Sequence, residues 1–167
     1  PLTRVELTDV SGAAPFDRTW RDGGRLAGFS ASHALLLQFS AGSGSGGPRG
    51  SVYIWKPEDR QPVRIAEGVA IAISPDGKQI LALPYKPPLS ISIVPTGAGR
   101  PQPLDLGSIE SVGWAGSLPD GRIVAAFSRP GGRPVAYLLS PDGRNPVPLL
   151  PEGATLEGAN LISPDGS

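Results

Sequence analysis

The tetrapeptide Ser-Pro-Asp-Gly is the pattern in this sequence that most resembles a chemical site. It occurs at 74–77, 140–143 and 163–166, and a fourth copy at 118–121 carries leucine in place of serine. A hydroxyl beside a carboxylate could belong to a nucleophile or to a metal loop. Calcium loops, however, place several carboxylates at alternating positions, whereas each copy here has one. Because Pro, Asp and Gly are the residues that tight turns favour, we predict that the tetrads are corners in the chain.

Three further patterns could carry chemistry, and each has a simpler interpretation. GSGSGG at 42–47 has the glycine spacing of a dinucleotide-binding loop, but such a loop leads into a helix, and here Pro48 and a predicted strand follow, so we predict a flexible loop. GFSAS at 28–32 approaches a nucleophile elbow but lacks its last glycine. His33 is the single histidine, and with no cysteine in the chain a zinc site lacks ligands. We therefore predict no catalytic residue, no metal site and no cofactor.

Composition narrows the classes of protein to which the chain can belong. Its 167 residues suffice for one domain with a core. The 15 basic and 15 acidic residues balance, which gives no overall attraction to nucleic acid or to an anionic membrane. No apolar run approaches the roughly 20 residues that cross a bilayer. Because the chain begins with proline and stops inside a repeated motif, one residue after its last tetrad, we expect it to be a piece of a longer protein.

The tetrads also reveal an internal repeat. Asp76, Asp120 and Asp165 lie at the same point of three similar segments, spaced by 44 and 45 residues, and each follows an apolar run. One period before Ser74 lies Ser30, in the segment LAGFSASHALLLQF, where the tetrad has decayed but the apolar runs remain. Four copies at a near-constant period predict a repeat architecture.

A second hairpin separates consecutive tetrad segments, at 51–68, 89–107 and 134–153. The last strand of each hairpin is rich in proline, which lacks the donor that a central strand needs, so these strands should lie at a sheet edge. One period is then four antiparallel strands, which we name A to D, from a narrow apolar inner strand to an outer strand. This predicts an all-β protein built from β-propeller blades. A β-sandwich is the competing interpretation, but it does not predict a strict four-strand period.

The segment AISPDGKQILAL with its following hairpin resembles the TolB-type, WD-repeat-like β-propeller repeat, and the resemblance extends from Leu26 to Ser167. It departs from the repeat at 30–33 and at Leu118. The resemblance implies a propeller fold and supplies no catalytic residues. The family includes protein-binding periplasmic propellers, sensor modules and the non-catalytic domains of some serine peptidases.

The repeat predicts one partial propeller domain over 1–167, about half of a closed ring. The expected blades are 26–68, 69–107 and 112–150. Residues 2–11 are predicted to form the outer strand of a preceding blade, and 156–167 the inner strand of a following blade. The ring could close by joining these two strands into a fourth blade or by self-association of two chains. Trp20, Trp55 and Trp114 are expected to fill space between blades rather than to bind sugars.

The blade order sorts the connections into two rims. The A–B turns, which hold the tetrads at 74–77, 118–121 and 163–166, share one rim with the C–D turns, one of which holds the tetrad at 140–143. The opposite rim carries the B–C loops 42–50, 84–89 and 129–133 and the D–A links 67–69, 107–111 and 151–158. The candidate binding rim consists of Arg49, Glu67, Tyr85, Lys86, Glu110, Arg129, Arg133 and Glu157. Mixed charge beside a tyrosine is consistent with a protein or peptide partner.

These observations predict a non-catalytic propeller module that binds a protein or peptide, or acts as a scaffold, within a larger bacterial extracytoplasmic protein that is periplasmic, secreted or anchored. We expect no nucleic-acid partner. The alternative is the gating propeller of a serine peptidase whose catalytic domain is absent from this chain; a downstream G-x-S-x-G followed by Asp and His would decide for it. An enzyme that uses the propeller funnel would have to rely on Glu67, Glu110 and Glu157.

Overall fold

Short antiparallel strands build the part of the chain that can be described. The structure is a computed structural model, and it describes residues 2–7, 16–21, 24–32, 34–44, 47–85 and 87–151. Within these ranges the chain is strand, turn and irregular connection, and no helix is long and apolar enough to cross a membrane.

Twelve of the strands form three four-stranded sheets, which we call blades 1 to 3. Blade 1 contains β3 (Gly24–Phe29), β4 (Leu35–Gly44), β5 (Gly47–Trp55) and β6 (Val63–Glu67). Blade 2 contains β7 (Val69–Ile73), β8 (Gln79–Leu83), β9 (Ser92–Pro95) and β10 (Gln102–Pro103). Blade 3 contains β11 (Ser111–Ser117), β12 (Ile123–Ser128), β13 (Val135–Leu139) and β14 (Val147–Pro148). In each blade the strands pair in sequence order, and every pairing is antiparallel.

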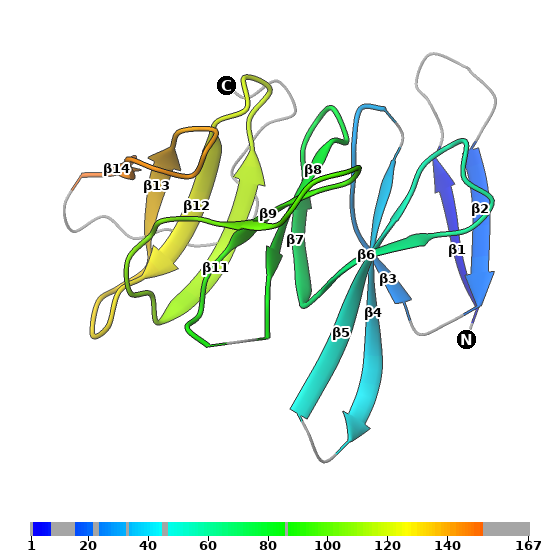
Figure 1. Cartoon of the computed structure of the whole chain (residues 1–167), viewed down its shortest axis with the longest axis horizontal. Helices are drawn as coiled ribbons and strands as arrows, with labels where there is room; N and C mark the ends of the chain where they lie inside the picture. Colours follow the sequence, from blue (N-terminus) through cyan, green and yellow to red (C-terminus); the bar gives the residue numbers. More distant parts are fainter. Residues whose placement is uncertain are drawn as a thin grey trace.

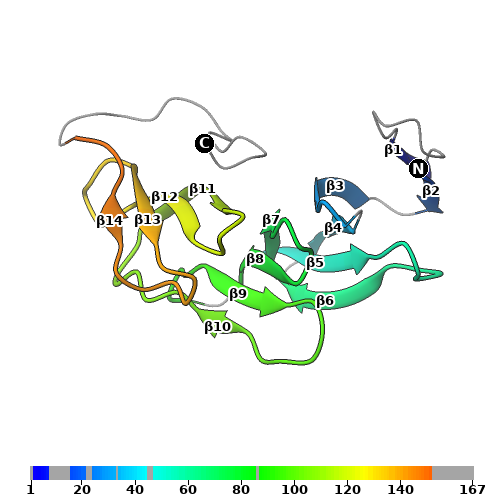
Figure 2. The same cartoon turned by 90° about the horizontal axis from the view of Figure 1, so that it is seen from above.

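The blades stand side by side with their inner strands together. Strand β7 packs against both β3 and β11 (Figure 1). Seen from above, the outer strands β6, β10 and β14 lie away from the inner strands, so the sheets fan out like part of a propeller (Figure 2). The predicted all-β architecture with a four-strand period is therefore confirmed.

Proline explains why the outer strands of blades 2 and 3 are short. Strands β10 and β14 have two residues each, and each ends in an exposed proline, Pro103 and Pro148. Both strands occupy the edge of their sheet, as predicted. A strand that lacks amide donors cannot serve as a template for further pairing, so these edges are protected against association with another strand.

A separate hairpin precedes blade 1. The strand expected over 2–11 is β1 (Leu2–Leu7), and it pairs with β2 (Phe16–Arg21) in a two-stranded sheet. Strand β2, and not β1, is therefore the strand that leads into blade 1. The inner strand predicted over 156–167 lies outside the described residues.

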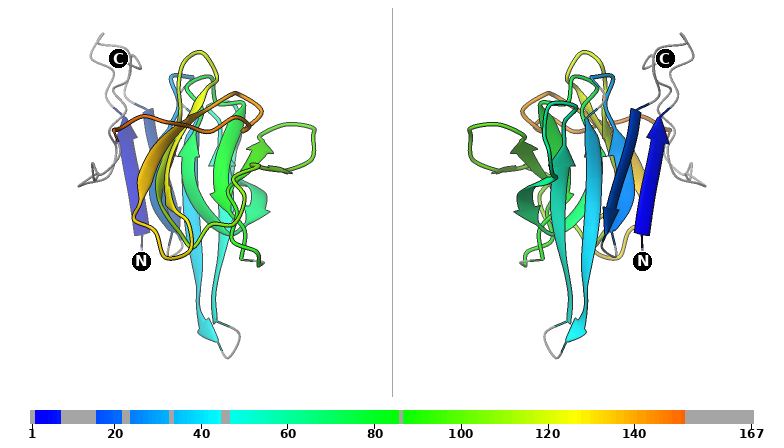
Figure 3. Two further views of the ribbon diagram at one scale, coloured as in Figure 1. Left: turned by 90° about the vertical axis from the view of Figure 1, so that its left-hand side faces the viewer. Right: turned by 90° about the vertical axis from the view of Figure 1, so that its right-hand side faces the viewer.

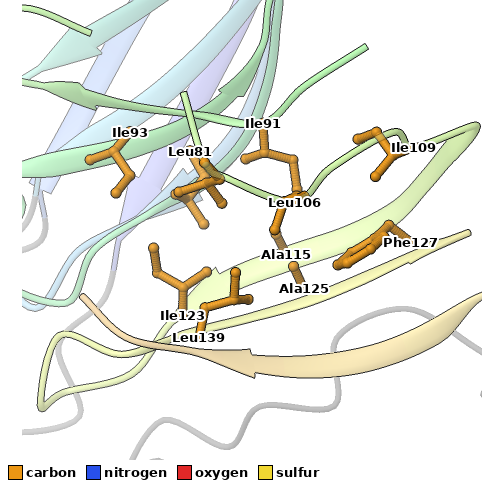
Figure 4. Close-up of a cluster of buried hydrophobic side chains, with 11 residues drawn as sticks. Leu81, Ile91, Ile93, Leu106, Ile109, Ala115, Ile123, Ala125, Phe127 and Leu139 are labelled. Carbon is orange, nitrogen blue, oxygen red and sulfur yellow. The ribbon is translucent and has the colours of Figure 1, made fainter. Parts of the chain in front are cut away.

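Alternate side chains of strand β8 contribute to two interblade cores. Leu81 of β8 points to blade 3, where it meets Ile123 and other apolar residues, whereas its neighbours Ile80 and Ala82 point to blade 1. Figure 4 shows the core between blades 2 and 3, with Phe127 among the buried side chains. Burying such a side chain stabilises the fold by about 1.5–3 kcal/mol. Two-sided burial explains why this strand reads as a continuous apolar run.

Two of the tryptophans are buried, each in a cluster of described residues from its own blade, so packing between blades stays a prediction. Trp55 is buried against Leu37, and its indole N–H donates to the carbonyl oxygen of Asp59 at 3.0 Å. Trp114 is buried in a cluster with Leu118 and other apolar residues of blade 3. The side chain of Trp20 lies outside the described part of the chain.

The hairpin of β4 and β5 is longer than the other B–C connections. It projects beyond the other strands (Figure 3), and its pairing continues to Gly44 opposite Gly47. We predicted a flexible loop over 42–47, and this is corrected: strand β4 continues to Gly44, which pairs with Gly47 at the start of β5. Backbone hydrogen bonds need no side chains, so a glycine-rich segment can continue an antiparallel ladder that the apolar strands have started.

Candidate functional site

The connections between strands lie at two rims. The A–B turns of the three blades lie together at the top of Figure 1, and the β4–β5 hairpin points to the bottom. A hollow between blades 1 and 2 is lined by Ser32 and Gly77 of A–B turns and by Pro57 and Thr96 of C–D turns, so these two kinds of turn share one rim, as predicted. We call it the turn rim, and we call the opposite side, with the B–C loops and D–A links, the loop rim.

The tetrad at 74–77 is a hydrogen-bonded corner on the turn rim. The Ser74 hydroxyl donates to Asp76 Oδ1 at 2.7 Å and accepts from the amide of Gln79 at 3.0 Å. Asp76 Oδ1 also accepts from the amide of Lys78 at 3.0 Å, and the amide of Gly77 donates to the carbonyl oxygen of Ser74 at 2.9 Å. The hydroxyl therefore holds the turn, which agrees with the predicted structural role.

The other copies keep parts of this arrangement. Ser140 donates to Asp142 and accepts from the amide of Arg144 at 3.2 Å. In the copy with leucine, the amide of Arg122 still donates to Asp120 Oδ1 at 3.0 Å. In the decayed copy, the hydroxyl of Ser30 accepts from the amide of Ala34 at 3.1 Å. The serine thus preserves its function after the Pro-Asp-Gly has been lost.

Acid should weaken the corner at Asp76. The hydrogen bond from the Ser74 hydroxyl, and then that from the Lys78 amide, lower the pKa of Asp76 below its ordinary 3.8. The ionised carboxylate of Asp76 therefore contributes its full stabilisation above the ordinary pKa. This contribution is lost as the pH falls through the lowered pKa. Asp76→Asn should make the free energy of unfolding less dependent on pH in the acid range. Urea denaturation from about pH 6 to about pH 3 measures this.

An exposed carboxylate provides the control for that measurement. Asp105 lies on a D–A link and forms no side-chain hydrogen bond with another described residue. Asp105→Asn removes the same charge as Asp76→Asn without removing such a hydrogen bond, so it is the charge-matched comparison. Equal flattening of the curve by both variants would contradict the assigned role of Asp76.

The loop rim holds five of the predicted binding residues in exposed positions, and two of them are carboxylates with a partner. Glu67 forms an ion pair with Arg64, with 2.9 Å between Oε1 and the guanidinium. Glu110 Oε2 accepts from the amide of Gly131 at 2.9 Å, so this carboxylate fixes the B–C turn of blade 3. Tyr85 is 44% exposed on the B–C loop of blade 2. Arg129 and Arg133, on the B–C loop of blade 3, are also exposed.

The remaining predicted rim residues cannot be placed as side chains. Arg49 lies in β5, where its backbone pairs with Ala41, and its side chain lies outside the description. Lys86 and Glu157 lie outside the described residues, as does His33. Within the described ranges, no three His, Asp or Glu side chains come close enough together to hold a metal ion.

Comparison with solved structures decides the fold. The structure of TolB from Acinetobacter baumannii matches this chain with a TM-score of 0.56 at 16% sequence identity. The match covers 90% of this chain and 44% of that one. The chain has the TolB-type propeller fold. It spans less than half the length of the matched TolB chain. No protein-family model and no curated protein matches the sequence.

Within the TolB-type fold, a buried glutamine ties blade 1 to blade 2. Gln38 of β4 is only 4% exposed. Its Nε2 donates to the carbonyl oxygen of Gly68 at 3.1 Å, and its Oε1 accepts from the amide of Ala70 at 2.6 Å. The amide of Gly68 in turn donates to the carbonyl oxygen of Gly50 at 3.0 Å. We call these four residues the link clamp, because they hold the D–A link at the base of the β4–β5 hairpin.

The link clamp is a positioning element of the loop rim that the sequence pattern does not predict. A Cβ on Gly50 would lie 2.7 Å from the hydroxyl oxygen of Tyr85 and 3.1 Å from the carbonyl oxygen of Gly68. Tyr85 therefore packs directly over the clamp. The signal in the sequence is a single polar residue, Gln38, inside the apolar run LLLQF. Its partners could not be named without the fold.

Proposed function

We propose that this chain is a non-catalytic binding module that holds a protein or peptide partner at its loop rim. The observation that carries the proposal is the set of exposed side chains on B–C loops of neighbouring blades, Tyr85 on blade 2 and Arg129 and Arg133 on blade 3. Neither arginine forms an ion pair with another residue that the structure describes. Arginine and tyrosine are the residue types that interfaces and their hot spots favour.

The described carboxylates support a role other than catalysis. A general acid or base must be free to exchange a proton with the substrate. Glu110 accepts from the amide of Gly131 and so has a structural partner, whereas Glu67 forms an exposed ion pair with Arg64. The hydroxyl of Ser74 is likewise engaged as a donor and as an acceptor within its turn.

The proposal includes a location outside the cytoplasm, as part of a larger protein. Its support is the resemblance of the repeat to a family that includes periplasmic propellers. The TolB-type fold supports the same inference at the level of architecture alone.

Removing the rim arginines should strongly reduce partner capture. We expect a chain with Arg49→Ala, Arg129→Ala and Arg133→Ala to capture at least about tenfold less partner, because truncating a central arginine of an interface typically costs 2 kcal/mol or more. The measurement is cross-linking and pulldown from a cell-envelope fraction, with the captured proteins quantified by mass spectrometry.

The chain offers a control with the same change in charge. Arg60, Arg100 and Arg144 are exposed on the C–D turns of blades 1, 2 and 3, at the turn rim. Changing these three residues to alanine should leave capture at the wild-type level. Unchanged capture by the loop-rim variant would refute the proposal, and equal losses in both variants would show that overall charge alone is responsible.

A further inference from the structure

The A–B turns of neighbouring blades meet in two different ways. Between blades 1 and 2, the amide of Ala31 donates to the carbonyl oxygen of Pro75 at 2.9 Å. The hydroxyl of Ser32 donates to the backbone carbonyl oxygen of Asp76 at 3.3 Å. Among the described residues, no hydrogen bond joins the A–B turn of blade 2 to that of blade 3. A hollow of about 170 Å³ lies there instead, and Leu118, which replaces the serine of the other tetrads, forms part of its wall.

The wall of this hollow combines apolar rings with one charge. Its residues are Ser74, Pro75, Asp76, Gln79, Ser117, Leu118, Pro119, Gly121 and Pro141. Asp76 is the only charged residue among them. By contrast, the hollow between blades 1 and 2 is lined by two lysines and two carboxylates, so its charges balance. Among the described lining residues, only the hollow between blades 2 and 3 has an unbalanced charge, and that charge is negative.

One oxygen of the Asp76 carboxylate remains free to accept a ligand. Oδ1 already accepts from the Ser74 hydroxyl and from the amide of Lys78. Among the described residues, Oδ2 has only the ammonium of Lys78 at 3.7 Å, and that lysine side chain is 82% exposed. An exposed pair of this kind contributes little and is readily displaced. The Ser117 hydroxyl and the Gln79 amide, which make no side-chain hydrogen bond to another described residue, add two further acceptors.

We propose that this hollow binds the side chain of an arginine from a peptide partner. Its volume is below the roughly 300 Å³ of the smallest ordinary ligand pockets, which suits one side chain. The planar, weakly hydrated guanidinium packs on apolar rings such as those of Pro119 and Pro141, where the compact ammonium of lysine loses more hydration. Its five N–H donors match the carboxylate oxygen and the two neutral acceptors. The site is on the turn rim and is independent of the proposed loop-rim interface.

The test is a titration of the whole chain with N-acetyl-L-arginine amide, followed by amide chemical shifts in NMR spectra. We expect millimolar binding, with the largest shifts at Gln79, Ser117 and Gly121. N-acetyl-L-lysine amide should bind more weakly, and the uncharged N-acetyl-norleucine amide should cause no saturable shifts. Equal binding of norleucine and arginine amides, lysine binding as tight as arginine, or shifts confined to other residues would overturn the proposal.

Variants at Gln79 separate binding from turn stability, because this exposed side chain takes no part in the corner. Gln79→Glu adds a second carboxylate and should tighten binding about three- to fivefold, which is the typical effect of one exposed ion pair. Gln79→Lys should abolish binding. Gln102 is an equally exposed glutamine on β10, and Gln102→Lys should leave the affinity unchanged. Wild-type affinity in Gln79→Lys would refute the site.

Discussion

Replacing Gly68 with alanine should lower the free energy of unfolding by about 3 kcal/mol or more. Gly68 has φ +132°, a conformation that side chains with a Cβ rarely adopt. A Cβ at this position would also clash with the carbonyl oxygen of Leu83 and lie 2.9 Å from its carbonyl carbon. Both are backbone atoms of β8, so neither can rotate away as a side chain could. The link or the strand must shift, and the link clamp would open with it.

The matched control is Gly97→Ala. Gly97 lies in the C–D turn of blade 2, and a Cβ there would meet no atom within 4 Å. This variant should stay within about 0.5 kcal/mol of the wild type. Urea denaturation followed by circular dichroism measures both variants. Similar losses in the two would show that glycine content, and not the geometry of the link, limits stability.

The periodicity of the sequence predicts the blades because turn chemistry and strand order both repeat. Tetrads such as that at 74–77 mark one corner of each period, and prolines such as Pro103 and Pro148 mark the opposite sheet edge. These are local signals, because each residue constrains the backbone at its own position. Strand β2 escapes prediction because its sequence, FDRTWR, has no regular apolar alternation. The full extent of the β4–β5 hairpin escapes it because glycine carries no pattern.

The loop rim is predictable only in part, for a related reason. Strand order places Glu110 and Arg129 on the same rim. Only the folded structure shows that Glu110 is engaged by the amide of Gly131 and that Arg129 remains exposed. The hollow between blades 2 and 3 depends on how Leu118 packs beside its neighbours. The presence of leucine in place of serine in one repeat does not by itself predict this packing.

Replacing Gln38 with methionine should lower the free energy of unfolding by about 2–5 kcal/mol, because it leaves two buried backbone groups without partners. Methionine has a similar length and is apolar, so the space stays filled. The carbonyl oxygen of Gly68 and the backbone amide of Ala70 both lose their hydrogen bond to the Gln38 side chain. These two groups lie 30 and 32 residues from Gln38 in the sequence. A polar side chain such as that of Gln38 would ordinarily be predicted to face solvent, but here it is buried.

Hydrogen exchange tests whether the loss arises at the link clamp. In Gln38→Met the amide of Ala70 should exchange markedly faster, while that of Ala125, in the core between blades 2 and 3, should change only with global stability. Gln102→Met, at an exposed position of β10, should leave both stability and exchange unchanged. Uniform acceleration of all amides would place the defect in the whole fold. Selective acceleration at Ala70 would show that the Gln38 side chain protects the link between blades 1 and 2 locally.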